Sequence, residues 1–178
     1  MSRRIASSKE NIVSQAEKDI RARLAEHELD FTAMSAVSNI YRSGSAIRNH
    51  MERELLTNYD LSWVAFTVLW VLWIWGEQET GVVAAEAGIT KGTLTGVMKT
   101  LQGRRLIRRI PHRDDRRRVS IGLSKAGERL IERLFPEFNK QETLVVGSLS
   151  LAEQNELARL LRKVLGRISA DNADCTDG

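Results

Sequence analysis

The feature that most constrains the fold is an uncharged stretch of fifteen residues, 61–75, with the sequence LSWVAFTVLWVLWIW. Such a stretch has to lie either in a membrane or in the interior of the protein. As a helix it would be about 22 Å long, which is shorter than the ~30 Å hydrocarbon core of a bilayer. The stretch therefore predicts a buried core helix, and no membrane is expected as a partner.

Amphipathic helices are predicted on both sides of this core helix. Over residues 31–57, apolar residues recur at helical spacing, at Met34, Val37, Ile40, Ile47, Met51 and Leu55. Within residues 125–170, Ser124 can cap a first helix, in which Pro136 predicts a kink, and the capping box at 150–153 (SLAE) opens a second helix. This second helix carries an apolar stripe at Leu157, Leu160, Leu161, Val164, Leu165 and Ile168.

The two ends of the chain extend beyond these helices. Residues 1–30 are predicted to be an N-terminal extension with a charged, moderately amphipathic helix over 9–29. Residues 171–178 are expected to form a frayed acidic tail. The single cysteine, Cys175, lies in this tail, so no disulfide can form within one chain, and a reducing cytoplasm is the expected location.

Residues 58–124 contain two short helical segments separated by Gly88. The first is the alanine-rich segment VVAAEAG, and Thr90 stands at the N-cap of the second. The second helix has two opposite faces. Its apolar face consists of Leu94, Val97, Met98 and Leu101, and its polar face, with small residues, consists of Gly92, Thr95, Gly96 and Lys99. A helix, a tight turn and a second helix with a polar outer face predict a helix-turn-helix.

A charged hairpin is predicted directly after this motif. Residues 106–110 and 119–123 are expected to be two short strands, and in the second strand apolar residues alternate with Ser120 and Gly122. The segment 104–118, RRLIRRIPHRDDRRR, has eight arginines and two aspartates and therefore a net charge of +6, whereas the net charge of the whole chain is +4. The net charge of the other residues is −2, from nineteen Lys and Arg against twenty-one Asp and Glu. The basic charge is therefore local, and it lies in a wing.

This charge distribution favours a partner that presents phosphates. Each cation that neutralises a phosphate of duplex DNA releases counterions, which favours binding. A helix with outward threonines and a lysine can enter the major groove, and an arginine on a hairpin can reach the minor groove. Gly92 and Gly96 would let the helix backbone approach the groove closely. Together these features predict double-stranded DNA as the partner.

The segment DDRRRVSIGLSKAG resembles the wing signature of the MarR family of winged-helix regulators. That signature is Asp-x-Arg, five residues, Leu-Thr/Ser, two residues and Gly, and its positions here are Asp115, Arg117, Leu123, Ser124 and Gly127. GITKGTLTGVMKTLQGRRLI resembles the family's recognition helix and the start of its wing, and the resemblance covers residues 31–168. One departure is VVAAEAG, which has smaller residues than the family's Leu-Ala-x-x-Leu-Gly pattern and implies different packing there.

The resemblance implies a mainly α fold, a winged helix-turn-helix over 58–124 with a two-stranded wing, and dimerisation helices over 31–57 and 125–170. It implies a homodimeric transcriptional regulator, a repressor that occupies a palindromic operator and is released by a small lipophilic or aromatic ligand. Arg117 would be the minor-groove arginine, with Asp115 holding its guanidinium through a bidentate pair. The predicted DNA-binding residues are Thr90, Lys91, Thr93, Thr95, Lys99, Arg113, Asp115, Arg116 and Arg117.

An aromatic stripe at Trp63, Phe66, Trp70 and Trp73 follows helical spacing along the core helix. Such stripes mostly belong to the hydrophobic core, but small-ligand pockets are also mostly apolar. Both interpretations stay open, and the ligand-binding candidates are Met51, Phe66 and Trp70.

Catalysis, metal binding and a cofactor are not expected. The three histidines, His27, His50 and His112, have no second ligand at a metal spacing such as i, i+4. We find no P-loop, no dinucleotide fingerprint in a supporting context and no nucleophile–base order.

Two other functions remain compatible with the sequence. An architectural protein would bind DNA by charge and shape, without the ~10³–10⁷-fold preference for its own site that a specific regulator shows. A winged helix can also be a protein-docking module, which need not show the steep salt dependence of phosphate neutralisation.

Replacing Arg117 tests the predicted role of the wing. Arg117→Ala should weaken DNA binding sharply, because it removes the cation expected in the minor groove, and should leave the dimer intact. Gel-shift titration measures the affinity and size-exclusion chromatography the oligomeric state. Unchanged affinity would remove the wing from the mechanism.

Overall fold

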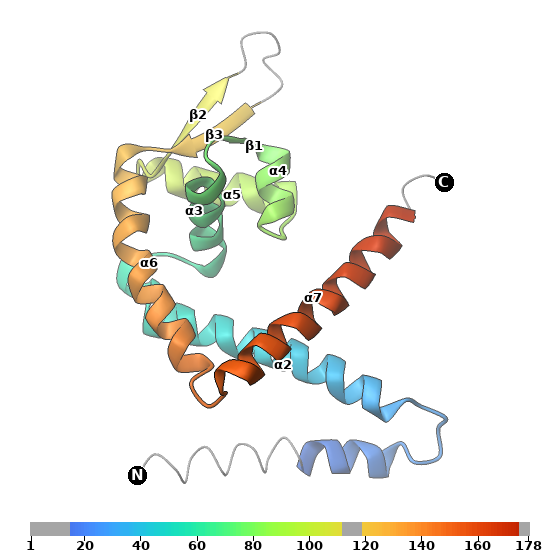
Figure 1. The fold of residues 1–178 in the computed structure, drawn as a ribbon. Coiled ribbons are helices and arrows are strands. Elements are labelled where there is room, and N and C mark those ends of the chain that lie inside the picture. Colours follow the sequence, from blue (N-terminus) through green and yellow to red (C-terminus); the bar gives the residue numbers. More distant parts are fainter. Residues whose placement is uncertain (1–14, 112–118, 175–178) are drawn as a thin grey trace. The chain divides into compact units, whose positions relative to one another are not determined.

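The computed structural model describes residues 15–111 and 119–174 (Figure 1). The chain divides into two units, one ending at Asn49 and the other beginning at His50, and each is described by itself. The domain limits and the dimerisation roles expected from the sequence remain predictions. Residues 15–23 are helical. The later elements are α2 (Phe31–Glu54), η1 (Leu56–Tyr59), α3 (Trp63–Trp75), β1 (Gln78–Glu79), α4 (Thr80–Glu86), α5 (Lys91–Gly103), β2 (Ile107–Pro111), β3 (Val119–Leu123), α6 (Lys125–Val145) and α7 (Leu151–Asp174).

The first unit contains the helical residues 15–23 and most of α2. The predicted helix over 9–29 is shorter at its C-terminal end, because residues 24–26 form a turn, and its residues before 15 lie outside the described part. Asp30 then caps α2 by accepting the backbone N–H groups of Thr32 and Ala33 at 3.0 and 2.9 Å. The extension therefore ends in a turn that leads directly into α2.

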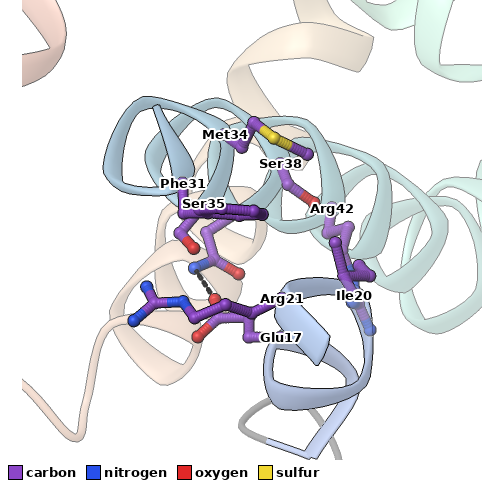
Figure 2. Close-up of a pocket in the computed structure, with 9 residues that line it drawn as sticks. Glu17, Ile20, Arg21, Phe31, Met34, Ser35, Ser38 and Arg42 are labelled. Atoms are coloured by element: carbon purple, nitrogen blue, oxygen red, sulfur yellow. Dashed lines mark hydrogen bonds between the residues drawn. The ribbon is translucent and has the colours of Figure 1, made fainter. Parts of the chain in front are cut away.

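The extension packs against α2 through polar and aromatic contacts. Asn39 donates a hydrogen bond to Glu17 at 2.9 Å, and the Arg21 guanidinium lies 5.6 Å from the centre of the Phe31 ring. Figure 2 shows these side chains around a small pocket of about 80 Å³. This volume has room for little more than water, so we interpret the pocket as a packing gap.

The uncharged stretch forms the central helix of the second unit, as predicted. Ser62 caps α3 by accepting the Ala65 N–H at 3.2 Å, and Glu52 accepts the Trp63 N–H at 2.7 Å. The buried residues of α3 are Ala65, Phe66, Val68, Leu69, Val71 and Leu72. The helix contacts α4, α5, α6 and β3, which cover most of its apolar surface, whereas Ile74 and Trp75 at its C-terminal end are exposed. No helix in the described residues is long and apolar enough to cross a membrane.

The helix-turn-helix is formed by α4 and α5, as predicted. Gly88 between them has φ +63°, a conformation that glycine adopts without strain. The Thr90 hydroxyl caps α5 by accepting the Thr93 N–H at 3.1 Å. The apolar face predicted for the second helix is confirmed, with Leu94, Met98 and Leu101 buried.

The wing strands pair antiparallel as predicted, from Ile107 opposite Leu123 to Pro111 opposite Val119. A third strand, β1, was not expected; it pairs with the other edge of β3, which makes β3 the central strand. The expected half-buried alternation in this strand is wrong, because Ser120 and Gly122 are buried as well. At Gly122 the reason is visible: the side chains of Arg108, Ile110 and Glu77 cover that face.

A close junction joins the end of α5, the start of β2 and the start of α6. We call it the wing joint; it consists of Arg105, Leu106, Ser124 and Gly127. The Ser124 hydroxyl donates to the Arg105 carbonyl at 2.6 Å and accepts the Gly127 N–H at 3.1 Å, while the Ser124 N–H donates to the Leu106 carbonyl at 3.0 Å. Ser124 therefore caps α6, as predicted, and also anchors the helix to the wing.

The last two helices match their predicted beginnings. Pro136 lies inside α6, and the helix continues through it to Val145. The capping box is present, because the Ser150 N–H donates to the Glu153 carboxylate at 2.8 Å. Hydrogen bonds from the side chain and backbone of Ser150 lower the pKa of the Glu153 carboxyl. The frayed tail expected from residue 171 is wrong for residues 171–174, because they continue α7. Residues 175–178, with Cys175, lie outside the described part.

Gly127→Ala should destabilise the second unit. A Cβ at this position would lie 2.1 Å from the Leu106 carbonyl oxygen, so the backbone of the wing joint would have to move, at a cost of about 1–3 kcal/mol or more. Urea unfolding followed by circular dichroism measures the change. Gly103→Ala is the matched control, because a Cβ there has no described heavy atom within 4 Å. Equal stability of the two variants would contradict the tight packing at the wing joint.

Candidate nucleic-acid interface

The outward face of α5 is polar and sterically open. The predicted site residues Thr90, Lys91, Thr93, Thr95 and Lys99 are all exposed. The Thr95 hydroxyl donates to the Lys91 carbonyl at 2.9 Å, which leaves its lone pairs free to accept a hydrogen bond from a ligand. This face therefore offers hydroxyl acceptors, methyl groups and two ammonium groups to whatever it meets.

Two glycines leave the backbone of this face bare. A Cβ on Gly92 would meet only the Thr90 hydroxyl, at 3.8 Å, and a Cβ on Gly96 would meet no described heavy atom within 4 Å. The packing of the described residues therefore does not require glycine at either position. Glycine inside a helix is less favourable than alanine by about 1 kcal/mol, so another reason for these residues is needed.

A concavity of about 260 Å³ lies between α5 and the wing strands. It is lined by Thr80, Lys91, Leu94, Thr95, Met98, Arg109 and Val119. Two of these residues, Lys91 and Arg109, bring positive charge from α5 and from β2. Arg109 was not among the predicted site residues, although it belongs to the arginine-rich segment and is exposed.

The tip of the wing lies outside the described residues. It contains four of the predicted DNA-binding residues, Arg113, Asp115, Arg116 and Arg117. The pair expected between Asp115 and Arg117 therefore remains a prediction. Outside the tip, strands β2 and β3 are paired as far as Pro111 and Val119.

Two arginines of the same segment hold the fold together. Arg104 donates to the carbonyls of Tyr59, at 2.9 Å, and Asp60, and thereby satisfies free acceptors where η1 ends in a left-handed residue. Arg108 donates to the Leu123 carbonyl at 3.2 Å and lies 3.9 Å from the Glu77 carboxylate. Neither Arg104 nor Arg108 was among the predicted DNA-binding residues, and both hydrogen-bond backbone carbonyls of the fold.

Tyr59 also connects η1 to α6. Burial raises the pKa of its hydroxyl above the ordinary value, and a hydrogen bond with Glu137 raises it further. The Arg133 guanidinium lies 5.5 Å from the centre of its ring. Tyr59 is therefore a neutral contact near neutral pH, held between α6 and Arg104.

An aromatic groove of about 260 Å³ lies between α3 and α6. We define it by its lining residues, which are Trp63, Phe66, Thr67, Trp70, Phe135, Phe138 and Glu142. Phe66 stacks on Phe138 with ring centres 4.2 Å apart, and Trp70 stacks on Phe135 at 4.5 Å. Phe66 is buried in the core, which the core interpretation of the stripe requires, and it also lines the groove. Ligand binding at Phe66 and Trp70 therefore remains a prediction.

The third ligand candidate lies elsewhere. Met51 is 1% exposed and belongs to the core; it is not among the residues that line the aromatic groove. Its nearest neighbour in sequence, His50, hydrogen-bonds Gln141 at 3.0 Å. The described residues contain no group of three or more side chains that could hold a metal ion.

Comparisons with known proteins agree with this arrangement. The family model described as MarR family matches residues 61–119, which run from α3 to the start of β3. The uncharacterized HTH-type transcriptional regulator YwaE of Bacillus subtilis is 40% identical over 148 residues, which are 83% of this chain and 84% of that protein.

Solved structures share the fold. One concerns the regulation of DNA binding of BpsR from Bordetella bronchiseptica by 6-hydroxynicotinic acid; it has a TM-score of 0.68 and 25% identity and covers 72% of this chain and 97% of that one. The DNA complex of MepR from S. aureus has a TM-score of 0.65 and 25% identity, covering 73% and 96%. The expected mainly α fold with a winged helix-turn-helix is thus confirmed, and the chain belongs to the MarR family of DNA-binding transcriptional regulators.

Proposed function

We propose that this regulator binds a palindromic operator in double-stranded DNA as a homodimer and acts as a repressor. The observation that carries the proposal is the exposed face of α5, where hydroxyl and ammonium groups surround a bare backbone beside a basic wing. Such a protein works where the chromosome is, so the cytoplasm remains the expected location. Regulation by occupancy needs no catalytic step, in keeping with a family of regulators rather than enzymes.

Base recognition is assigned to α5. Thr93, Thr95 and Lys99 would face base edges in the major groove, where hydroxyl and ammonium groups find donors and acceptors. Thr90, Lys91 and Arg109 lie at the edges of this face and would contact phosphates, as would the predicted wing-tip residues. The MepR structure, a complex with DNA, supports DNA as the partner by similarity.

A second copy of the chain would place two such faces on one duplex. The apolar stripe of α7 is uncovered in the single chain, with Leu157, Leu160, Val164, Leu165 and Ile168 each between 41 and 62% exposed. Another exposed apolar set lies on α2, at Val37, Ile40 and Tyr41. Surfaces of this kind are typical of a dimer interface, and two-fold symmetry explains why the operator would be palindromic.

The aromatic groove is the proposed site of a releasing ligand. Its rings can bury a small aromatic or lipophilic molecule, with Phe66 and Trp70 among the contacts. A ligand that changes the separation of the two recognition helices would prevent simultaneous contact with half-sites ~34–36 Å apart. The BpsR structure, in which an aromatic acid regulates DNA binding, supports a ligand-responsive mechanism.

Gly96→Ala should weaken DNA binding without weakening the fold. The added methyl group has space in the free protein and should stabilise α5 by about 1 kcal/mol, but it would stand between the helix and the groove. We expect about tenfold weaker operator binding, equivalent to one base contact of about 1–3 kcal/mol. Gly103→Ala, at the other end of α5, is the control and should bind normally. If Gly96→Ala also binds normally, α5 does not approach DNA at this point.

Genomic selection tests the proposed function as a whole. Purified protein is mixed with sheared host DNA near physiological salt, and the retained fragments are sequenced. We expect an enriched inverted repeat, bound ~10³–10⁷ times more tightly than random duplex, with an affinity that falls steeply with salt. Retained DNA without an enriched motif would favour an architectural protein. Absence of a salt-dependent interaction would favour a protein-docking module.

A further inference from the structure

The aromatic groove has an unusual electrostatic character for a site that could bind an organic acid. Five of its seven lining residues are aromatic, and Glu142 contributes a carboxylate. Aromatic rings present the negative side of their quadrupole on their faces, which attracts cations. Among the described residues that line the groove, none is a lysine, an arginine or a histidine. Both the rings and the carboxylate therefore favour positive charge.

The rings are arranged at several angles around the groove. Phe66 and Phe138 are nearly parallel, with an angle of 18° between their planes. Trp63 is tilted by 51° to Phe66 and by 41° to Phe138. Trp63 and Trp70 are only half-buried, so parts of their rings remain available. The stacked pairs Phe66–Phe138 and Trp70–Phe135 each use one face of their rings, so a cation would meet the exposed parts of Trp63 and Trp70 beside the Glu142 carboxylate.

Glu142 is held at the exposed edge of the groove. The Asn139 side chain donates a hydrogen bond to one of its carboxylate oxygens at 2.9 Å. Both residues lie on α6, one turn apart, so this contact orients the carboxylate without neutralising it. An organic anion in the groove would meet this charge and the negative ring faces together, whereas a cation would be attracted by both.

We propose that the aromatic groove selects small lipophilic cations, such as quaternary ammonium compounds or protonated aromatic amines, over aromatic carboxylates. The inference rests on the proposed function, because it names the charge class of the ligand at the same site. The proposed preference for cations also distinguishes the ligand of this chain from that of BpsR, whose structure concerns regulation by an aromatic acid.

Two isosteric probes and an anion that shares their benzyl group test the charge preference. Benzyltrimethylammonium is the cation, neopentylbenzene is its neutral isostere, and phenylacetate is the anion. Isothermal titration with the full-length protein should show the cation binding at least about tenfold more tightly than either of the others, as expected when ring faces and a carboxylate add to the same apolar contact. Equal or tighter binding of the neutral or anionic probe, or no binding of any probe, overturns the proposal.

A pair of charge-removing variants tests the role of Glu142. Glu142→Gln should reduce the affinity for the cation by about three- to tenfold and leave the neutral probe unchanged, because only the charge attraction is lost. Glu132→Gln is the matched control, since Glu132 is exposed on the same helix and does not line the groove. Both residues are at the surface, so the variants should fold. An unchanged preference for the cation in Glu142→Gln contradicts the role of the carboxylate.

Release of DNA is measured separately from binding in the groove. If the cation binds selectively and releases a fragment obtained by genomic selection, both proposals are supported. If it binds selectively without releasing DNA, the charge preference stands and the releasing-ligand function fails. If a different compound releases DNA while the cation does not bind, the regulator function stands and the charge preference is wrong.

Discussion

The close approach of Gly127 to the Leu106 carbonyl is the contact on which the second unit depends. No side chain fits between them, since even a Cβ would lie 2.1 Å from the oxygen. Ser124 hydrogen-bonds both sides of this contact, so the end of α5, the first wing strand and the start of α6 are held together. The glycine and serine of the wing signature are therefore explained by packing. Its aspartate and arginine, Asp115 and Arg117, lie outside the described residues, and their contact with DNA remains a prediction.

The wing joint also connects α5 and the wing to α6, so it would link the two proposed sites (Figure 1). The helix that begins at Ser124 brings Phe135, Phe138 and Glu142 to α3, where they form the aromatic groove. At the same end of α5, next to the wing joint, Arg104 holds the carbonyls of Tyr59 and Asp60. In the proposed mechanism, a ligand bound between α3 and α6 displaces α6. Because α6 is anchored to the wing, this displacement would reach the wing over a short distance.

Local signals in the sequence predicted the helix starts well, because a serine or threonine cap is recognised from neighbouring residues. The predicted caps Thr90, Ser124 and Ser150 are all confirmed, and Ser62 caps α3 in the same way although it was not predicted as a cap. Contacts between distant residues were not predictable in the same way. The strand at Gln78 and Glu79 has no apolar pattern and exists through pairing with β3. Likewise, nothing near Arg104 indicates that it binds carbonyls 44 and 45 residues earlier. The exposed face of α5 was predicted, but Arg109 was missed because its role depends on how β2 lies beside α5.

The central claim is that the exposed face of α5 reads the major groove at two symmetric half-sites. Methylation protection by dimethyl sulfate on a selected operator tests it directly, because guanine N7 lies in the major groove and adenine N3 in the minor groove. We expect two symmetric groups of protected guanines whose centres are about 34–36 Å apart, one helical turn. Protection limited to adenine N3, or a single unsymmetric patch, would contradict it.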